Sequence, residues 1–339
     1  MKLSKLAYLH LVSMVAYPFL YRGGNHPDYG MLDIVGNDNK PVANKTLSLT
    51  TWNIGYAALG AKANFAADGG NDLRALKRAE IAIAAEEIGR EAATFDTDMI
   101  LFQELAQANY LTRQVKVIES IETHLKRYSA SFWEGLRLPY VPKFLQLSHG
   151  MGIYSRFGIE ETHALKMPAE PGSMFAGIKK HYAITLTDLP IEGSDKKWVI
   201  INVHLSAFDE GANIRQAQIR AVFDTAQQEY SRGNYVIIGG DWNMRLSKTD
   251  FPHIAKGENK FVVHEFPIDR LPEDWSIAAD DDVPTVRALH KPYIQGVNNT
   301  MIIDGFVVSP NVAIDSVKTK DLQFEHTDHH PVTGVFSVK

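Results

Sequence analysis

YVIIGGDWN, residues 235–243, is the stretch around which the rest of the chain can be arranged. Its first four residues carry no charge and are largely β-branched, which predicts a buried strand. Asp241 and Asn243 follow at the end of that strand, where α/β folds place their chemistry. On an extended segment their side chains point the same way, so that one can take a proton from a water while the other holds it. Taken alone, the same residues also suit an ordinary Asp/Asn turn.

The composition limits the classes of protein to which this chain can belong. A chain of 339 residues can bury a substantial core, and about 250 of them suffice for one α/β domain. Hydrophobic content of 45% and charged content of 22% are typical of a soluble globular protein. With 35 basic against 40 acidic residues, the chain lacks the Lys/Arg excess that sequence-independent duplex binding usually needs, which weighs against a nuclease. The absence of cysteine excludes disulfides, thiolate catalysis and zinc-thiolate sites.

Residues 1–45 form an expected hydrophobic leader and linker. The segment 6–21 has no formal charge except any that His10 carries, but it is short for a spanning helix, is interrupted by Pro18, and lacks a signal-cleavage pattern after it. Three interpretations stay open: a helix on the domain or on a membrane surface, a signal or anchor, and core packing. The location is therefore cytoplasmic, membrane-associated or exported. Residues 22–45, rich in Gly, Pro, Asn and Asp, are typical of a linker.

Apolar periodicity predicts the remaining elements. It indicates strands at residues 47–54, 99–105, 149–157, 198–205, 301–308 and 332–338, and helices at 72–95, 111–127 and 213–231. Residues 250–297 show no strong periodicity and are expected to form a long loop region. Polar residues recur where the strands end or begin: Asn53, Glu104, His204, Asp241, Asn243, Asp304, Asp328 and His329. Singly, each suits a surface charge, a core histidine or a strand-edge solubiliser, but their joint occurrence favours a functional site.

Seven segments, taken in order, resemble the motifs of the endonuclease/exonuclease/phosphatase superfamily. They are Thr51-Trp52-Asn53, Gln103-Glu104, Gly152 to Arg156, Asn202 to Leu205, Gly240 to Asn243, Ile303-Asp304 and Thr327 to Pro331. This is the fold of pancreatic-type deoxyribonuclease, sphingomyelinase and inositol-polyphosphate 5-phosphatase. The resemblance implies a four-layer α/β sandwich of two mixed β-sheets flanked by helices. It implies that residues 46–339 are one catalytic domain, which we expect to be monomeric, with a divalent-metal-dependent phosphoesterase site.

The residue types suit that chemistry. A hard cation neutralises oxyanion charge in phosphate ester hydrolysis, and Mg²⁺ prefers one or two carboxylates with several retained waters. We assign the metal to Glu104, with Asn53 assisting and Asp328 nearby, and expect Mn²⁺ to substitute for Mg²⁺. Arg156 and Arg287 are candidates for contacting the phosphate, although a strand-end arginine is as often a structural ion-pair partner.

The other polar residues are assigned to the catalytic steps. Asp241 would orient or deprotonate the attacking water, and Asn243 would hold that water or a phosphate oxygen. His329, held by Asp304, would donate to a non-bridging phosphate oxygen. His204 would do the same or protonate the leaving group, and the sequence does not decide which histidine is the acid.

These residues predict hydrolysis of a small or lipid-borne phosphate ester, by a phosphodiesterase or a phosphatase. The alternative is a non-specific endonuclease or deoxyribonuclease, and a third hypothesis is a binding protein that keeps the fold without activity. Gly55 stands where apurinic endonucleases carry an acidic residue, and His204-Leu205 replaces their tyrosine-containing motif. The Asn202-Val203-His204-Leu205 segment looks more like those of sphingomyelinases and phosphoinositide phosphatases.

Overall fold

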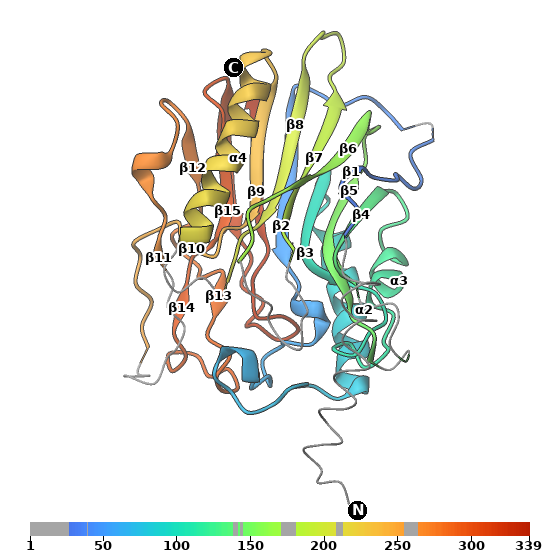
Figure 1. The fold of residues 1–339 in the computed structure, drawn as a ribbon, viewed down its shortest axis with the longest axis vertical. Coiled ribbons are helices and arrows are strands. Elements are labelled where there is room, and N and C mark those ends of the chain that lie inside the picture. Colours follow the sequence, from blue (N-terminus) through green and yellow to red (C-terminus); the bar gives the residue numbers. More distant parts are fainter. Residues whose placement is uncertain are drawn as a thin grey trace, which may run out of the picture.

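Two mixed β-sheets lie face to face in the computed structural model of the chain (Figure 1). The structure describes residues 27–38, 40–137, 142, 145–170, 181–207, 213–253 and 264–339. The apolar segment 6–21 lies outside these ranges, so its three interpretations stay open. Side chains from both sheets, such as Leu49 and Leu101 from one and Ile237 and Phe306 from the other, form a shared core between them. Burying this apolar surface is the main force that holds the sheets together.

The strands of each sheet come from distant parts of the sequence. The seven-stranded sheet has the order β1 (Gly30–Met31), β6 (Glu161–Lys166), β7 (Ala183–Pro190), β8 (Lys197–His204), β9 (Tyr235–Asp241), β15 (Asp304–Val308), β12 (Ser276–Ala278). The six-stranded sheet has the order β16 (Val312–Thr319), β17 (Val332–Val338), β2 (Thr46–Asn53), β3 (Met99–Ala106), β5 (Ser148–Ser155), β4 (Ser129–Arg137). Two short ladders pair β10 (Met244–Arg245) with β11 (His264–Glu265) and β13 (Val286–Arg287) with β14 (Thr300–Met301).

Helices cover the outer faces of the two sheets. On the six-stranded sheet, α2 (Arg78–Thr94) and α3 (Val117–Glu122) pack against apolar side chains of β3. On the other sheet, α4 (Asn213–Ser231) packs against β8 and β9. In the described part of the chain, short 3₁₀ turns occur at η1 (Gly55–Ala57), η2 (Ala66–Asp68) and η4 (Ile268–Arg270). Figure 1 shows the helices on opposite sides of the paired sheets. The expected four-layer α/β sandwich is confirmed.

Most predicted elements agree with the structure to within two residues, and the bounds of α4 agree fully. The helix predicted at 72–95 begins at Arg78, because the Glu80 carboxylate accepts a hydrogen bond from the backbone N–H of Lys77 at 2.9 Å and caps it there. The helix predicted at 111–127 is wrong over most of its length. The side chain of Asn109 accepts hydrogen bonds from the backbone N–H groups of Leu111 and Thr112 and holds a turn instead.

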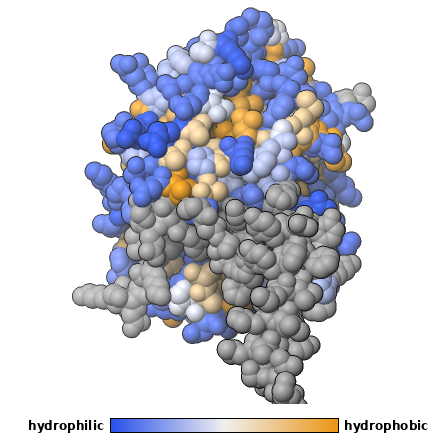
Figure 2. Space-filling model, in the orientation of Figure 1, coloured by the Kyte–Doolittle hydropathy of each residue, from blue (hydrophilic) through white to orange (hydrophobic). Residues whose placement is uncertain are grey.

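One face of the molecule is mostly polar where the described residues form it (Figure 2). Figure 2 shows a largely hydrophilic face, with hydrophobic residues gathered near its centre. Among the described residues, no helix is both long enough and apolar enough to cross a membrane.

Candidate active site

Three neighbouring strands of the seven-stranded sheet bring three polar side chains together. In the strand register, Asp241 on β9 lies between His204 on β8 and Asp304 on β15. Gly240 permits this close pairing: its φ is 151°, and a Cβ there would lie 2.0 Å from the carbonyl oxygen of Val203. A larger residue would push β8 and β9 apart where the site forms, so glycine is required at this position.

The six-stranded sheet contributes Glu104 through a β-bulge. The pairing of β3 with β5 shifts register between Phe102 and Leu105, and Glu104 within that shift has a φ of 52°. A bulge turns a side chain away from the direction that regular alternation would give it. His204 Nε2 lies 3.7 Å from Glu104 Oε1 and 3.7 Å from Asp241 Oδ2. Residues of both sheets therefore meet at one rim of the sandwich.

Asn53, at the end of β2, joins the two sheets directly. Its amide nitrogen donates to Asp241 Oδ2 at 3.0 Å, and its amide oxygen accepts from the backbone N–H of Gly55 at 3.1 Å. One layer deeper, Gln103 Nε2 donates to Asn202 Oδ1 at 2.7 Å across the same gap. These buried polar pairs fix how the two sheets meet below the site, because an unpaired amide there would carry a desolvation cost.

The imidazole of His329 lies between the carboxyl groups of Asp304 and Asp241. Its Nδ1 is 2.9 Å from Asp304 Oδ2, and its Nε2 is 3.9 Å from Asp241 Oδ2 and from Asp328 Oδ2. Burial opposes the positive charge, but Asp304, Asp328 and Asp241 outweigh it and raise the pKa of His329 to about 10. The imidazole is therefore a protonated donor at neutral pH.

Asp241 is buried and titrates unusually high. Burial, followed by the charge of Asp304, raises the pKa of Asp241 to about 7, against the opposing effects of His329 and of hydrogen bonds from Asn53 and Asn243. A carboxylate with a pKa in this range can accept a proton near neutral pH. Asp241, Asp304 and His329 are buried, whereas His204 and Glu104 are partly exposed. Access from solvent is therefore on the side of His204 and Glu104.

Asn243 does not continue the strand. Its φ of 49° places it in the left-handed region, its backbone N–H donates to Asp241 Oδ1 at 2.8 Å, and its side-chain nitrogen donates to the carbonyl of Leu205 at 2.9 Å. The expectation that residues 241 and 243 lie on one extended segment is therefore wrong. The turn uses Asn243 to hold Asp241 and the end of β8 in place.

Of the two arginines proposed as phosphate contacts, Arg156 lies apart from this cluster, whereas Arg287 borders it, because its backbone N–H donates to the carbonyl of Asp328 at 3.1 Å. Arg156 donates to the backbone and carboxylate of Asp96, next to the end of β5 that pairs with Met99, whereas Glu104 lies at the other end of β3. Arg287 is fully buried, and its guanidinium donates to the carbonyls of Leu59 at 3.0 Å and Gly60 at 2.8 Å, among others. Both arginines bind the protein's own backbone, and their placement does not support a contact with substrate.

Tyr56 is a site residue that the sequence analysis missed. Its hydroxyl donates to the Glu104 carboxylate, and its ring lies edge-on to His149 with 4.9 Å between the ring centroids. Burial, then the charge of Glu104 and the hydrogen bond to it, raise the pKa of Tyr56 well above its usual range, so the hydroxyl stays protonated. The sequence held one signal, an aromatic residue three positions after Asn53 in a glycine-rich loop.

The residues at this rim fit a hard cation. The Oδ1 atoms of Asp328 and Asp304 are buried, with no hydrogen-bond partner among the described residues. Gly55 leaves room for the first of them, because a Cβ at Gly55 would lie 2.5 Å from Asp328 Oδ1. Carboxylate and amide oxygens are the ligands that Mg²⁺ prefers. Asp241, Asp304 and His329 could also group around an ion. We favour Glu104, Asp328 and Asn53, because they offer oxygen ligands alone and His329 is already paired with Asp304.

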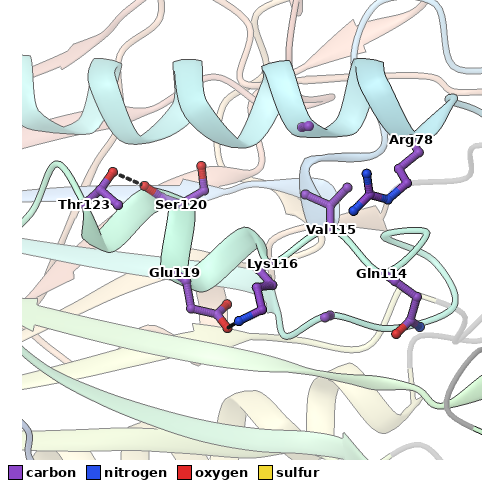
Figure 3. A pocket seen from close by; sticks show the side chains of 9 residues that line it. Arg78, Gln114, Val115, Lys116, Glu119, Ser120 and Thr123 are labelled. Atoms are coloured by element: carbon purple, nitrogen blue, oxygen red, sulfur yellow. Dashed lines mark hydrogen bonds and ion pairs between the residues drawn. The ribbon is translucent and has the colours of Figure 1, made fainter.

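One hollow of the molecule lies apart from the cluster, and another lies beside it. A groove of about 800 Å³ between α2 and α3 is lined by Arg78, Gln114 and Lys116 among others, and contains none of the cluster residues (Figure 3). A cavity of about 30 Å³ lies beside His204, between Trp133, Leu136 and Met151. Only the smaller of these two hollows adjoins the candidate site, through His204.

Comparisons with known proteins agree with this fold. A family model described as "Endonuclease/Exonuclease/phosphatase family" matches residues 50–329. No curated protein sequence matches the chain. Truncated TDP2 of Caenorhabditis elegans has a similar structure, with 16% identity and a TM-score of 0.54 over 86% of this chain and 98% of that one.

Two further solved structures share the fold at low identity. An endonuclease/exonuclease/phosphatase from Beutenbergia cavernae has 15% identity and a TM-score of 0.57 over 86% of this chain and 72% of that one. The human Nocturnin catalytic domain with bound sulfate has 14% identity and a TM-score of 0.54 over 91% of this chain and 98% of that one. At such identity, the likeness shows the fold alone.

Proposed function

Since the chain belongs to the endonuclease/exonuclease/phosphatase family, we propose that it hydrolyses a phosphate ester at the cluster centred on Asp241, using a bound Mg²⁺. The observation that carries the proposal is the setting of Asp241: a buried carboxylate with a pKa of about 7, held by Asn53 and Asn243 and facing two histidines. The reaction is attack of water on phosphorus. One P–O bond forms, and the ester P–O bond breaks.

Asp241 acts on the water. It accepts the proton that the water loses as its oxygen bonds to phosphorus, and its pKa near neutrality suits that transfer. Hydrogen bonds from Asn53 Nδ2 and the backbone N–H of Asn243 fix one carboxylate oxygen each. A base held in this way needs little reorganisation in the transition state.

The two histidines act on the phosphate. His329 is protonated and fixed by Asp304, so it donates to a non-bridging oxygen as negative charge develops there. His204, partly exposed between Glu104 and Asp241, donates to the departing ester oxygen or to a second phosphate oxygen. Glu104, Asp328 and Asn53 would hold Mg²⁺ or Mn²⁺, which when bound neutralises charge on the phosphate and lowers the barrier to attack.

We propose a small or lipid-borne phosphate ester as the substrate. The side chains near His204 include the apolar Trp133, Leu136 and Met151, which suits a substrate whose ester group lies along an apolar surface. The net charge of -5 disfavours a polyanion. Nuclease activity is the second candidate, because TDP2 of D. rerio, which has a similar fold, is described as complexed with a single strand DNA product. Membrane-surface association through residues 6–21 and a monomeric state remain proposals.

A substrate panel tests this function. Purified protein with Mg²⁺ is assayed against a bis-aryl phosphate, sphingomyelin, phosphoinositides, single-stranded DNA and supercoiled plasmid. We expect turnover of the aryl diester and of one lipid class, and none of plasmid. Cleavage of DNA with an affinity that falls steeply as salt rises would establish the nuclease alternative. No turnover of any phosphate ester would overturn the proposed function.

A further inference from the structure

The turn that follows β2 has an unusual backbone. Gly55, Tyr56 and Ala57 have φ angles of 49°, 56° and 55°, so three consecutive residues lie in the left-handed region. The turn is closed by hydrogen bonds from the N–H of Ala57 to the carbonyl of Ile54 and from the N–H of Ala58 to that of Gly55, both at 2.8 Å. Left-handed conformations are unfavourable for residues with a Cβ, and they collect at functional sites where the surroundings enforce them.

This conformation directs the Tyr56 side chain at Glu104. The hydroxyl donates to the carboxylate, and Glu104 itself is left-handed, with a φ of 52°. The ring of Tyr56 is held on one side by His149 and on another by the small apolar cluster of Leu59, Ala63 and Leu289. Both residues of this hydrogen bond, Tyr56 and Glu104, therefore have an unfavourable left-handed backbone conformation. Packing against its neighbours fixes the Tyr56 ring.

The segment from Asn53 to Ala57 contacts two further carboxylates of the site. Asn53 donates to Asp241, and Gly55 leaves the space that Asp328 Oδ1 fills. Five residues thus set three acidic side chains relative to one another. We propose that Tyr56 is a positioning residue, which holds the Glu104 carboxylate in the orientation in which it binds the divalent cation. This inference rests on the proposed function.

Loss of the Tyr56 hydroxyl should weaken metal binding. Without it, the carboxylate of Glu104 loses one of the contacts that orient it, and His204 Nε2 lies farther away, at 3.7 Å. Residues that orient a metal ligand typically contribute about 10-fold to 100-fold in metal affinity. Tyr56→Phe keeps the ring and its contact with His149, so we expect the fold to be retained and the affinity for Mn²⁺ to fall about 10-fold.

The test is calorimetric titration of Mn²⁺ into metal-free protein without substrate. Tyr154→Phe is the matched control, because the buried Tyr154 also donates to a glutamate, Glu122, at 3.2 Å, away from the cluster. We expect weaker Mn²⁺ binding in Tyr56→Phe only. At saturating Mn²⁺, turnover by Tyr56→Phe should return to near the wild-type rate, which a general loss of structure would not allow.

The outcomes separate the two claims. If the wild type binds Mn²⁺ and Tyr56→Phe binds it equally well, the positioning role is overturned and the proposed hydrolysis stands. Equal weakening in both variants would assign the effect to buried tyrosine hydroxyls in general, and this too overturns the inference. If the wild type binds no divalent cation at all, the metal assignment of the proposed function fails, and the role of Tyr56 fails with it.

Discussion

Gly55 gives the most local test of the site. A Cβ at this position would lie 2.5 Å from Asp328 Oδ1, and the φ of 49° disfavours any other residue. Gly55→Ala should therefore lower the free energy of unfolding by about 2 kcal/mol or more and should also reduce turnover, since it displaces Asp328. Chemical denaturation and the rate of ester hydrolysis measure the two effects.

Gly193→Ala is the control for that substitution. Gly193 has a φ of 70° with nothing within 4 Å of its would-be Cβ, so it carries the backbone cost without the clash. We expect a loss of about 1 kcal/mol and unchanged turnover. Equal effects of the two substitutions on turnover would show that Asp328 does not need the space beside Gly55.

At the scale of single residues, the sequence predicted which side chains lie close together. It did not predict the backbone conformations that hold them there. Asn53, Glu104, His204, Asp241, Asp304 and His329 form a continuous series of contacts, as strand-end polar residues in one fold should. The left-handed turns at Tyr56 and Asn243 could not be predicted, because neither residue type requires that conformation. Arg287 suited a phosphate contact by residue type, and only the packing shows that it is buried.

At the scale of elements, Arg287 at the end of β13 holds the loop that follows η1. Its buried guanidinium donates to the carbonyls of Leu59 and Gly60, and Asp328 lies close enough to act on its pKa. Arg287→Met should lower the free energy of unfolding by about 3 kcal/mol, because those carbonyls and the nearby carboxylate lose their donor and their counter-charge. Urea denaturation followed by circular dichroism measures this loss.

Arg156→Met is the matched arginine variant. Its ion pair is with Asp96, which is largely exposed, so the loss should stay within about 1 kcal/mol and kcat/KM should not change. If Arg287→Met unfolds like the wild type but raises KM about tenfold, or if Arg156→Met does so, that arginine contacts the phosphate as first proposed from the sequence.

Elements with a strong apolar pattern could be predicted, and elements defined by their neighbours could not. The helix α4 and the strands β2, β3, β8, β9 and β17 carry apolar residues at clear intervals. The strand β16 lies at a sheet edge with most of its residues exposed or partly exposed, so its sequence carries little periodic signal. The bulge that redirects Glu104 depends on pairing with β5 and leaves no mark on the sequence of β3.

At the scale of the whole molecule, the site exists because two sheets meet at one rim. Asp241 and His204 come from the seven-stranded sheet, and Asn53 and Glu104 come from the six-stranded sheet. Neither sheet alone holds both the candidate base and the candidate metal ligands. The hydrogen bonds from Asn53 to Asp241 and from Gln103 to Asn202 fix the distance between these groups. The sandwich is thus the scaffold that keeps the candidate base and the candidate metal ligands in register.

The central claim is that Asp241 activates water beside a bound divalent cation. The most direct measurement is kcat for a bis-aryl phosphate with wild-type protein before and after chelation, and with Asp241→Asn at saturating Mg²⁺. Asp98→Asn serves as the control, because Asp98 lies at the opposite end of the sheet, where it accepts hydrogen bonds from Ser48. We predict that chelation abolishes turnover, that Mg²⁺ or Mn²⁺ restores it, and that Asp241→Asn alone lowers kcat about 100-fold or more. Retention of more than about a tenth of kcat by folded Asp241→Asn, or turnover that survives chelation, would contradict the account.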